Sequence, residues 1–293
     1  SSGELTNAVY GVASMTLSLL RAEEPDALLF CFDEGEDTFR HQENATYKDG
    51  RAETPDDFFP QIPRTLDMID AWGIRHVSNP QYEADDFLCA YAKAAEKEGM
   101  KVTIVTGDRD AFQLATELTR IAIPHKGYQA PEYLGPKEIV AKYGIRPDQV
   151  ASYKGLTGDA SDNLPGVKGI GPKTAAELLQ KYDTLQGIYD HLGEVKGTVQ
   201  DKLSRDREQA FFCERMATLV CDFSLPVSLE ETELKEHSLE NVLEFFKNIE
   251  FLTLGKRLQG VAASEYGKRH FLQDSLPEPL ATVSKGVSAG QMT

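Results

Sequence analysis

The order of apolar segments predicts an α/β fold with a parallel-sheet core, followed by a helical region. Two continuous apolar runs, ALLFCF at residues 27–32 and KVTIVT at residues 101–106, are typical of strands that are buried on both faces. Helical apolar spacing occurs over residues 7–20, 62–72 and 83–98. Strands that alternate with helices over short links favour a doubly wound parallel sheet.

The chain divides into three regions of different character. Residues 1–134 form the predicted α/β core, which includes a polar, irregular segment at residues 34–57. Residues 135–260 carry short helical patterns punctuated by glycine and predict a helical region packed on the core. Residues 261–293 are rich in Ser, Gly, Ala and Pro, and this composition predicts a tail or linker.

The composition indicates a soluble globular protein. Of the 293 residues, 41% are hydrophobic and 27% are charged, and no apolar run is long enough for a membrane span or a signal peptide. The scattered cysteines contain no C-x-x-C pair, which argues against a zinc site and against a disulfide framework. A reducing cytoplasm is therefore expected. These cysteines are Cys31, Cys89, Cys213 and Cys221.

The net charge of −16 argues against nucleic-acid binding by the surface as a whole, because phosphate contacts require Lys and Arg. The placement of the acidic residues changes this interpretation. Asp33 follows the first apolar run, and Asp108 and Asp110 follow the second. Open α/β sheets bind ligands at the carboxyl ends of their strands, so these acids are expected to be neighbours in space.

Two further acidic groups lie elsewhere in the chain. Glu83, Asp85 and Asp86 open a predicted helix, where acids also complement the helix dipole without any other role. Asp159 and Asp162 lie in GDASDN, which alone would be a turn or a helix cap. Eight carboxylates in close groups would repel one another unless cations lie among them. Hard oxygen ligands suit Mg²⁺ or Mn²⁺, and a two-metal carboxylate site hydrolyses phosphodiesters.

Residues 164–179, LPGVKGIGPKTAAELL, match a helix–hairpin–helix signature within residues 164–180. Glycine permits the tight turn, and backbone N–H groups at the start of the second helix can hold a DNA phosphate without reading sequence. A glycine-rich turn between packed helices is the alternative, and the spacing of a P-loop is not met. The candidate DNA-binding positions are Gly166, Lys168, Gly169, Gly171, Lys173 and Thr174.

A basic segment, FRHQENATYKDGR at residues 39–51, follows the strand end that carries Asp33. A solvated loop is one interpretation of this segment. Beside the acids it becomes a candidate clamp for a phosphate through Arg40, Lys48 and Arg51, with Tyr47 stacking on a base.

Taken together, these motifs resemble the 5′-nuclease domain of bacterial DNA polymerase I, of the flap endonuclease family. The matching stretches are FDEGEDTFRHQENATYKDGR, YEADDFLCAYAKAAEKEG, TIVTGDRDAFQL and YKGLTGDASDNLPGVKGIGPKTAAELL. They extend from about Leu5 to about Leu258, which is nearly the whole chain.

The resemblance implies a PIN-like fold and a role for each group. Asp33, Glu83, Asp85 and Asp86 correspond to one metal group, and Asp108, Asp110, Asp159 and Asp162 correspond to the other. Arg40, Lys48 and Arg51 correspond to the basic residues of a helical arch through which a 5′ flap passes, and the hairpin from Gly166 to Lys173 corresponds to a duplex contact that also binds K⁺.

The same resemblance implies partners and location. They are DNA with a 5′ flap, nick or RNA primer, a covalently linked polymerase domain, a monomeric state, and a cytoplasmic, nucleoid-associated protein with no membrane contact. The family begins with an apolar strand that ends in Asp-Gly, whereas this sequence begins SSGELTNAVYG, so a fragment is expected.

Two alternatives to a nuclease remain at this point. Without the aspartate of the first strand, the chain would be a structure-specific DNA-binding module that does not cut. A small-molecule phosphatase would need an Asp-x-Asp nucleophile at an early strand end, and Asp33 is followed by Glu34 and Gly35.

Overall fold

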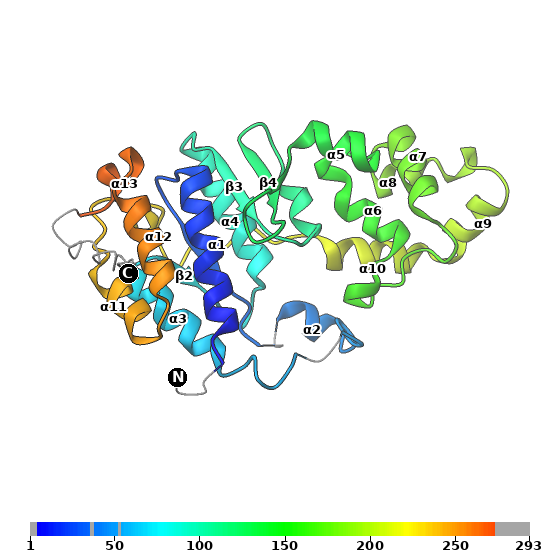
Figure 1. The fold of residues 1–293 in the computed structure, drawn as a ribbon. Helices are drawn as coiled ribbons and strands as arrows, with labels where there is room; N and C mark the ends of the chain where they lie inside the picture. Colours follow the sequence, from blue (N-terminus) through cyan, green and yellow to red (C-terminus); the bar gives the residue numbers. More distant parts are fainter. Residues whose placement is uncertain (1–4, 36–37, 52–53, 273–293) are drawn as a thin grey trace, which may run out of the picture.

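The computed structural model describes residues 5–35, 38–51 and 54–272 (Figure 1). The strands are β1 (Leu29–Cys31), β2 (Arg75–Val77), β3 (Val102–Val105), β4 (Thr119–Ile123) and β5 (Glu132–Leu134). The helices of the first half are α1 (Asn7–Glu23), α2 (Phe39–Glu43), α3 (Gln61–Trp72) and α4 (Ala84–Lys97). The later helices are α5 (Pro136–Tyr143), α6 (Val150–Thr157), α7 (Pro172–Tyr182), α8 (Leu185–Asp190), α9 (Thr198–Arg205), α10 (Arg207–Ala217), α11 (Glu240–Asn248), α12 (Leu252–Ala262) and α13 (Glu265–His270).

The predicted α/β class is confirmed, with the strands in two short sheets. β1 pairs in parallel with β2, and β3 pairs in parallel with β4, which pairs antiparallel with β5. The two apolar runs form β1 and β3, as predicted. β2 is a strand that periodicity missed, because three residues with only Val77 buried carry too little apolar pattern.

Helix boundaries follow from local chemistry. The predicted helices at residues 7–20, 62–72 and 83–98 are confirmed as α1, α3 and α4. α3 ends at Gly73, whose φ of 71° is the left-handed conformation that glycine adopts without strain. At the start of α4 the Asp86 side chain accepts the Glu83 backbone N–H at 3.1 Å, and the Glu83 carbonyl oxygen accepts the Asp86 N–H at 3.0 Å. This cap places the EADD acids, residues 83–86, at the N-terminus of α4.

The helical region packs mainly through α6 and α10. Gly155 of α6 allows close approach, since a Cβ there would lie 2.9 Å from the Ala210 carbonyl oxygen of α10. One apolar core runs from α4 and β4 through the helices of this region (Figure 1). A second core lies between α1, α3, α11 and α12 on the other side of the molecule (Figure 1). Trp72 and Phe246 meet edge to face in it, with centroids 5.6 Å apart.

The C-terminal prediction is corrected in part. Residues 261–272 belong to the fold and not to the tail or linker expected over 261–293. Ser264 caps α13 through the Gly267 N–H, and the side chains of Tyr266 and Phe271 are buried in the second core. Small residues around Ser264 mask this short helix in the sequence. Residues 273–293 lie outside the described residues.

The expectation about cysteines is also corrected. Cys89 of α4 and Cys221 form a disulfide with their Cα atoms 5.2 Å apart, although 132 positions separate them in sequence. Sequence spacing gave no sign of it, because the fold brings the segment after α10 back across α4. Within the described residues, no helix combines the length and the apolar character needed to cross a membrane.

Candidate metal centre

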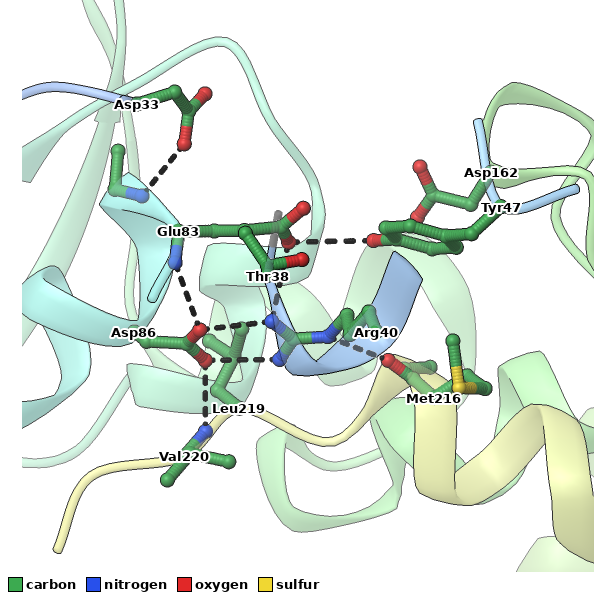
Figure 2. A network of polar contacts seen from close by, with 12 residues as sticks. Asp33, Thr38, Arg40, Tyr47, Glu83, Asp86, Asp162, Met216, Leu219 and Val220 are labelled. Carbon is green, nitrogen blue, oxygen red and sulfur yellow. Dashed lines mark hydrogen bonds and ion pairs between the residues drawn. The ribbon is translucent and has the colours of Figure 1, made fainter. Parts of the chain in front are cut away.

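The start of α4 gathers acids from two strand-end regions. Asp33, beyond β1, accepts a hydrogen bond from the Ala84 N–H at 2.7 Å, so it lies at the first turn of α4 (Figure 2). Glu83 is the N-cap residue of α4, and its side chain is buried. Asp33 and the EADD acids therefore lie together at the N-terminal end of α4, as the family resemblance implied. The positive end of the helix dipole stabilises carboxylates there.

Arg40 of α2 is the most heavily bonded side chain at this site (Figure 2). Its guanidinium makes a bidentate contact with Asp86 at 2.8 Å for each pair of atoms, and donates to Glu83 Oε2 at 3.1 Å. It also donates to the carbonyl oxygens of Met216 and Thr218 at 2.9 and 3.0 Å. All five N–H donors of the guanidinium are thus engaged, and the residue is only 1% exposed.

The contacts of Arg40 and Asp86 differ from those that the sequence suggested. Arg40 was expected to contact a phosphate, yet it has no free donor and no exposed surface in this structure. Asp86 was expected to be a metal ligand, yet it is fully buried and both its oxygens are engaged. Besides Arg40, they accept the N–H groups of Glu83 and Val220 at 3.1 and 2.9 Å. Periodicity could not show this pairing, because the partners are 46 positions apart.

Tyr47 is likewise buried in this structure. The sequence suggested a ring that stacks on a base, but the ring is buried among Leu164, Met216 and their neighbours. Its hydroxyl donates to Glu83 Oε2 at 3.3 Å (Figure 2). Burial, together with the charge of Glu83, raises the pKa of Tyr47. An aromatic residue that packs this way braces the segment and does not offer a stacking face.

A second group of acids lies in two loops, one after β3 and one after α6. Asp110, Asp159 and Asp162 each offer a carboxylate oxygen within 4.8 Å of the others. Asp110 is held by its own loop, where its N–H donates to Asp108 Oδ1 at 2.9 Å. Asp110 Oδ1 is buried, and the ammonium of Lys154 lies against it. A buried carboxylate oxygen needs a cation beside it to compensate for its removal from water.

Three cations besides Arg40 lie against the acids of the two groups. Lys48 Nζ is 2.5 Å from Glu83 Oε1, and Arg51 donates to Asp162 Oδ1 at 2.7 Å and to the Ser161 carbonyl oxygen at 2.9 Å. Lys48 and Arg51 are thus placed beside the acids, as the sequence suggested. The third cation is Lys154 of α6, which forms ion pairs with Asp110 and with Asp159 Oδ2, the latter at 2.5 Å.

Lys154 is the charged group that the sequence analysis missed. It lies five positions before Asp159, within a short helix whose pattern gave no reason to separate it from surface lysines. What distinguishes it is burial, which the sequence does not show: only 11% of its side chain is exposed. Lysine is almost never buried to this extent without a partner.

The crowding and burial of the acids change their pKa values. Burial raises the pKa of Asp85 to about 7, and the nearby charges of Asp108, Asp33 and Glu83 add to the effect. Burial would also raise the pKa of Asp159, but hydrogen bonds from Lys154 and Ser161 outweigh it and lower that pKa. These interactions show that Asp85 and Asp108 are electrostatic neighbours, although they come from α4 and the loop after β3.

The acids and cations line one small hollow. Its lining includes Asp85, Asp108 and Asp110 beside Lys48 and Arg51. The donor set is carboxylate oxygen alone, which fits Mg²⁺ or Mn²⁺ better than softer metals. Five of the eight predicted acids line the hollow, namely Glu83, Asp85, Asp108, Asp110 and Asp162, and Asp86 is bound to Arg40.

The predicted hairpin lies next to the second acid group. Gly158 and Gly166 cross so closely that a Cβ on Gly166 would lie 2.1 Å from the Gly158 nitrogen, and both have positive φ. Gly171 precedes α7, and Lys173 in its first turn has a side chain that is 90% exposed. Lys168 is also exposed, although its N–H donates to Asp206 at 2.9 Å.

The raised pKa of Asp85 predicts a pH-dependent stability of the metal-free protein. The folded state keeps a proton on Asp85 up to about pH 7, whereas the unfolded chain releases it near the ordinary pKa of 3.8. Stability therefore falls as pH rises through this window. In EDTA, Asp85→Asn should raise the free energy of unfolding by up to about 4 kcal/mol at pH 8 and change it little at pH 4.

Chemical denaturation of both proteins at the two pH values measures this difference. Asp67→Asn, at an exposed position on α3, is the matched control and should leave the pH profile unchanged. Equal profiles for the wild type and Asp85→Asn would show that Asp85 does not titrate in this way.

The solved structures that are similar to this chain share its fold. A structure titled "Divalent metal ions (zinc) bound to T5 5′-exonuclease" aligns with a TM-score of 0.65 at 17% identity, over 89% of this chain and 92% of that chain. "The catalytic core of Rad2 in complex with DNA substrate" aligns with a TM-score of 0.57 at 17% identity, over 88% and 87%.

Comparison of the sequences identifies the family of the chain in addition to its fold. DNA polymerase I of Bacillus subtilis is 39% identical over 93% of this chain and 31% of its own length, and that of Mycobacterium tuberculosis is 37% identical over 90% and 29%. The chain thus spans under a third of these relatives. The family description "5′-3′ exonuclease, N-terminal resolvase-like domain" matches residues 1–144, and "5′-3′ exonuclease, C-terminal SAM fold" matches residues 145–258. With both parts present, the chain belongs to the 5′-3′ exonuclease family.

Proposed function

We propose that this chain is a divalent-metal-dependent 5′-3′ exonuclease and flap endonuclease that hydrolyses DNA phosphodiesters at 5′ flaps, nicks and RNA primers. The observation that carries the proposal is the group of Asp110, Asp159 and Asp162, each of which offers a carboxylate oxygen within 4.8 Å of the others. Family membership and the DNA named for the Rad2 structure support DNA as the substrate.

Two Mg²⁺ or Mn²⁺ ions, when bound, would supply a nucleophilic water and stabilise the charge of the attacking and leaving oxygens. Asp110, Asp159 and Asp162 would hold one ion, and Asp33, Glu83, Asp85 and Asp108 would hold the other. Lys48 and Arg51 lie on the same hollow, so each can turn from its carboxylate to the phosphate that is cut. Arg40 and Asp86 act as positioning residues, because they fix the start of α4.

The hairpin would hold the duplex next to this site. Lys173 and Lys168 are exposed, and the N–H groups at the start of α7 face no helical partner by virtue of their position. Such contacts bind the phosphate backbone and carry no sequence preference. We extend the proposal to a K⁺ ion at this hairpin, to a monomeric state, to a linked polymerase domain as in the relatives, and to work at the nucleoid.

Asp108→Ala should lower the rate of 5′-flap DNA cleavage in Mg²⁺ or Mn²⁺ by at least about a hundredfold. Loss of a metal ligand should cost more than loss of a residue that only hydrogen-bonds to a ligand, for which the cost is usually about ten- to a hundredfold. Single-turnover assays on labelled flap DNA measure the rate, with EDTA as the metal-free reference. Asp67→Ala is the control for an exposed acid outside the site and should cleave normally. Wild-type protein that binds the flap without cutting it would favour the DNA-binding module instead.

Lys168→Gln together with Lys173→Gln should weaken binding of duplex-containing flap DNA and make that binding less dependent on salt, by about two phosphate contacts. Fluorescence anisotropy in EDTA at several salt concentrations measures both quantities. Lys181→Gln, at an exposed lysine near the far end of α7, should leave affinity and salt slope unchanged. An unchanged salt slope in the double variant would remove the hairpin from the DNA contact.

A further inference from the structure

Lys154 occupies an unusual position for a lysine. It projects from α6 and forms ion pairs with Asp110, in the loop after β3, and with Asp159, in the loop after α6. These two acids belong to the group whose oxygens lie within 4.8 Å of one another. The third member, Asp162, is met by Arg51. The ammonium of Lys154 therefore lies where the charge of this group is concentrated.

The side chains around Lys154 leave it few other interactions. Only 11% of its surface is exposed, and the exposures of the Asp110 and Asp159 side chains are similarly small, at 12% and 17%. Removing an ammonium from water to this extent is costly unless a carboxylate compensates for it. Lys154 and the two acids are thus a matched set in the metal-free protein, with each compensating the burial of the others.

We propose that the Lys154 ammonium is a resident cation of the Asp110–Asp159–Asp162 group, which a divalent metal ion must displace in order to bind. The inference rests on the proposed function, since it concerns the same metal centre. Two cations cannot share oxygens this close without strong repulsion, and an ion that enters the group meets the positive charge of Lys154 first. Lys154 is then a positioning residue that sets the metal affinity of this group.

The structure also provides a place for the displaced side chain. Lys154 lines an open cavity of about 530 Å³ on the side of the acids that faces α5 and α6. Tyr143, Tyr153 and Thr157 also line this cavity, so an ammonium can find aromatic faces and a hydroxyl there. Because Lys154 already lines this cavity, rotation of its flexible side chain can carry the ammonium into it. The exchange of Lys154 for a metal ion is therefore compatible with a fixed backbone.

The exchange has two consequences for the protein. Without metal, Lys154 keeps Asp110 and Asp159 from repelling each other and so holds the loops together. With metal, the same charge lowers the affinity of this group, because part of the binding free energy is spent on displacing the ammonium. The metal site of this group should thus be weaker than its three carboxylates alone would make it.

Titration of the full chain with Mn²⁺ alone, followed by electron paramagnetic resonance of the free ion, tests the proposal without using activity. Lys154→Gln should bind Mn²⁺ roughly tenfold more tightly at one site, because the opposing charge is gone. It should also melt at a lower temperature in EDTA and gain more from added Mn²⁺ than the wild type. Lys154→Arg, which keeps the charge, should bind Mn²⁺ no more tightly than the wild type.

Lys142→Gln is the matched control, because it breaks a lysine–carboxylate pair with Glu132 away from the site and should leave Mn²⁺ affinity unchanged. Equal or weaker Mn²⁺ binding by Lys154→Gln, or tighter binding by Lys154→Arg, would overturn the inference. A wild type that binds no Mn²⁺ would instead contradict the proposed metal centre itself, so the two failures are distinguishable.

Discussion

The buried contact between Arg40 and Asp86 is the interaction on which the site depends. The Arg40 guanidinium joins α2, the first turn of α4 and the C-terminal end of α10, through Asp86 and the carbonyl oxygens of Met216 and Thr218. Desolvation makes such a pair a weak source of net stability, whereas loss of one partner leaves a buried charge uncompensated. The pair therefore acts mainly by fixing where α4 begins, and with it Glu83 and Asp85.

Charge balance is the second constraint. A cluster of seven carboxylates outside the Arg40 pair would push its loops apart, and the chain opposes this with Lys48, Arg51 and Lys154. The cost of incomplete compensation remains visible in Asp85, whose pKa is raised to about 7. A net charge of −16 is thus compatible with a DNA-binding protein, because the acids that matter are gathered where cations meet them.

Sequence patterns predicted the features that depend on local chemistry. Apolar runs predicted β1 and β3, and the ends of these strands bring Asp33 and Asp108 near Asp85, although the two strands lie in separate sheets. The features that failed depend on contacts between distant segments. Arg40 and Tyr47 were expected at the surface, but the folded structure buries both side chains. The Cys89–Cys221 disulfide joins segments that are 132 positions apart in sequence.

Short elements were the other source of error. β2 has three residues and α13 has six, so neither provides enough repeats for a period to stand out from its surroundings. α13 is stabilised by Tyr266 in a core that includes α1 and α12, which is a tertiary effect and overrides a composition typical of a linker. Lys154 was missed for a different reason, because its burial depends on the two loops that carry Asp110 and Asp159.

A double-mutant cycle on the Arg40–Asp86 pair tests the central claim most directly. Arg40→Met, Asp86→Leu and the double variant would be compared by denaturant unfolding in EDTA. Each single substitution should cost about 3–5 kcal/mol, and the double should cost far less than their sum, because it leaves no unpaired buried charge. Small and additive losses, with Arg40→Met weakening only DNA binding, would show instead that Arg40 acts on the phosphate and does not hold α4.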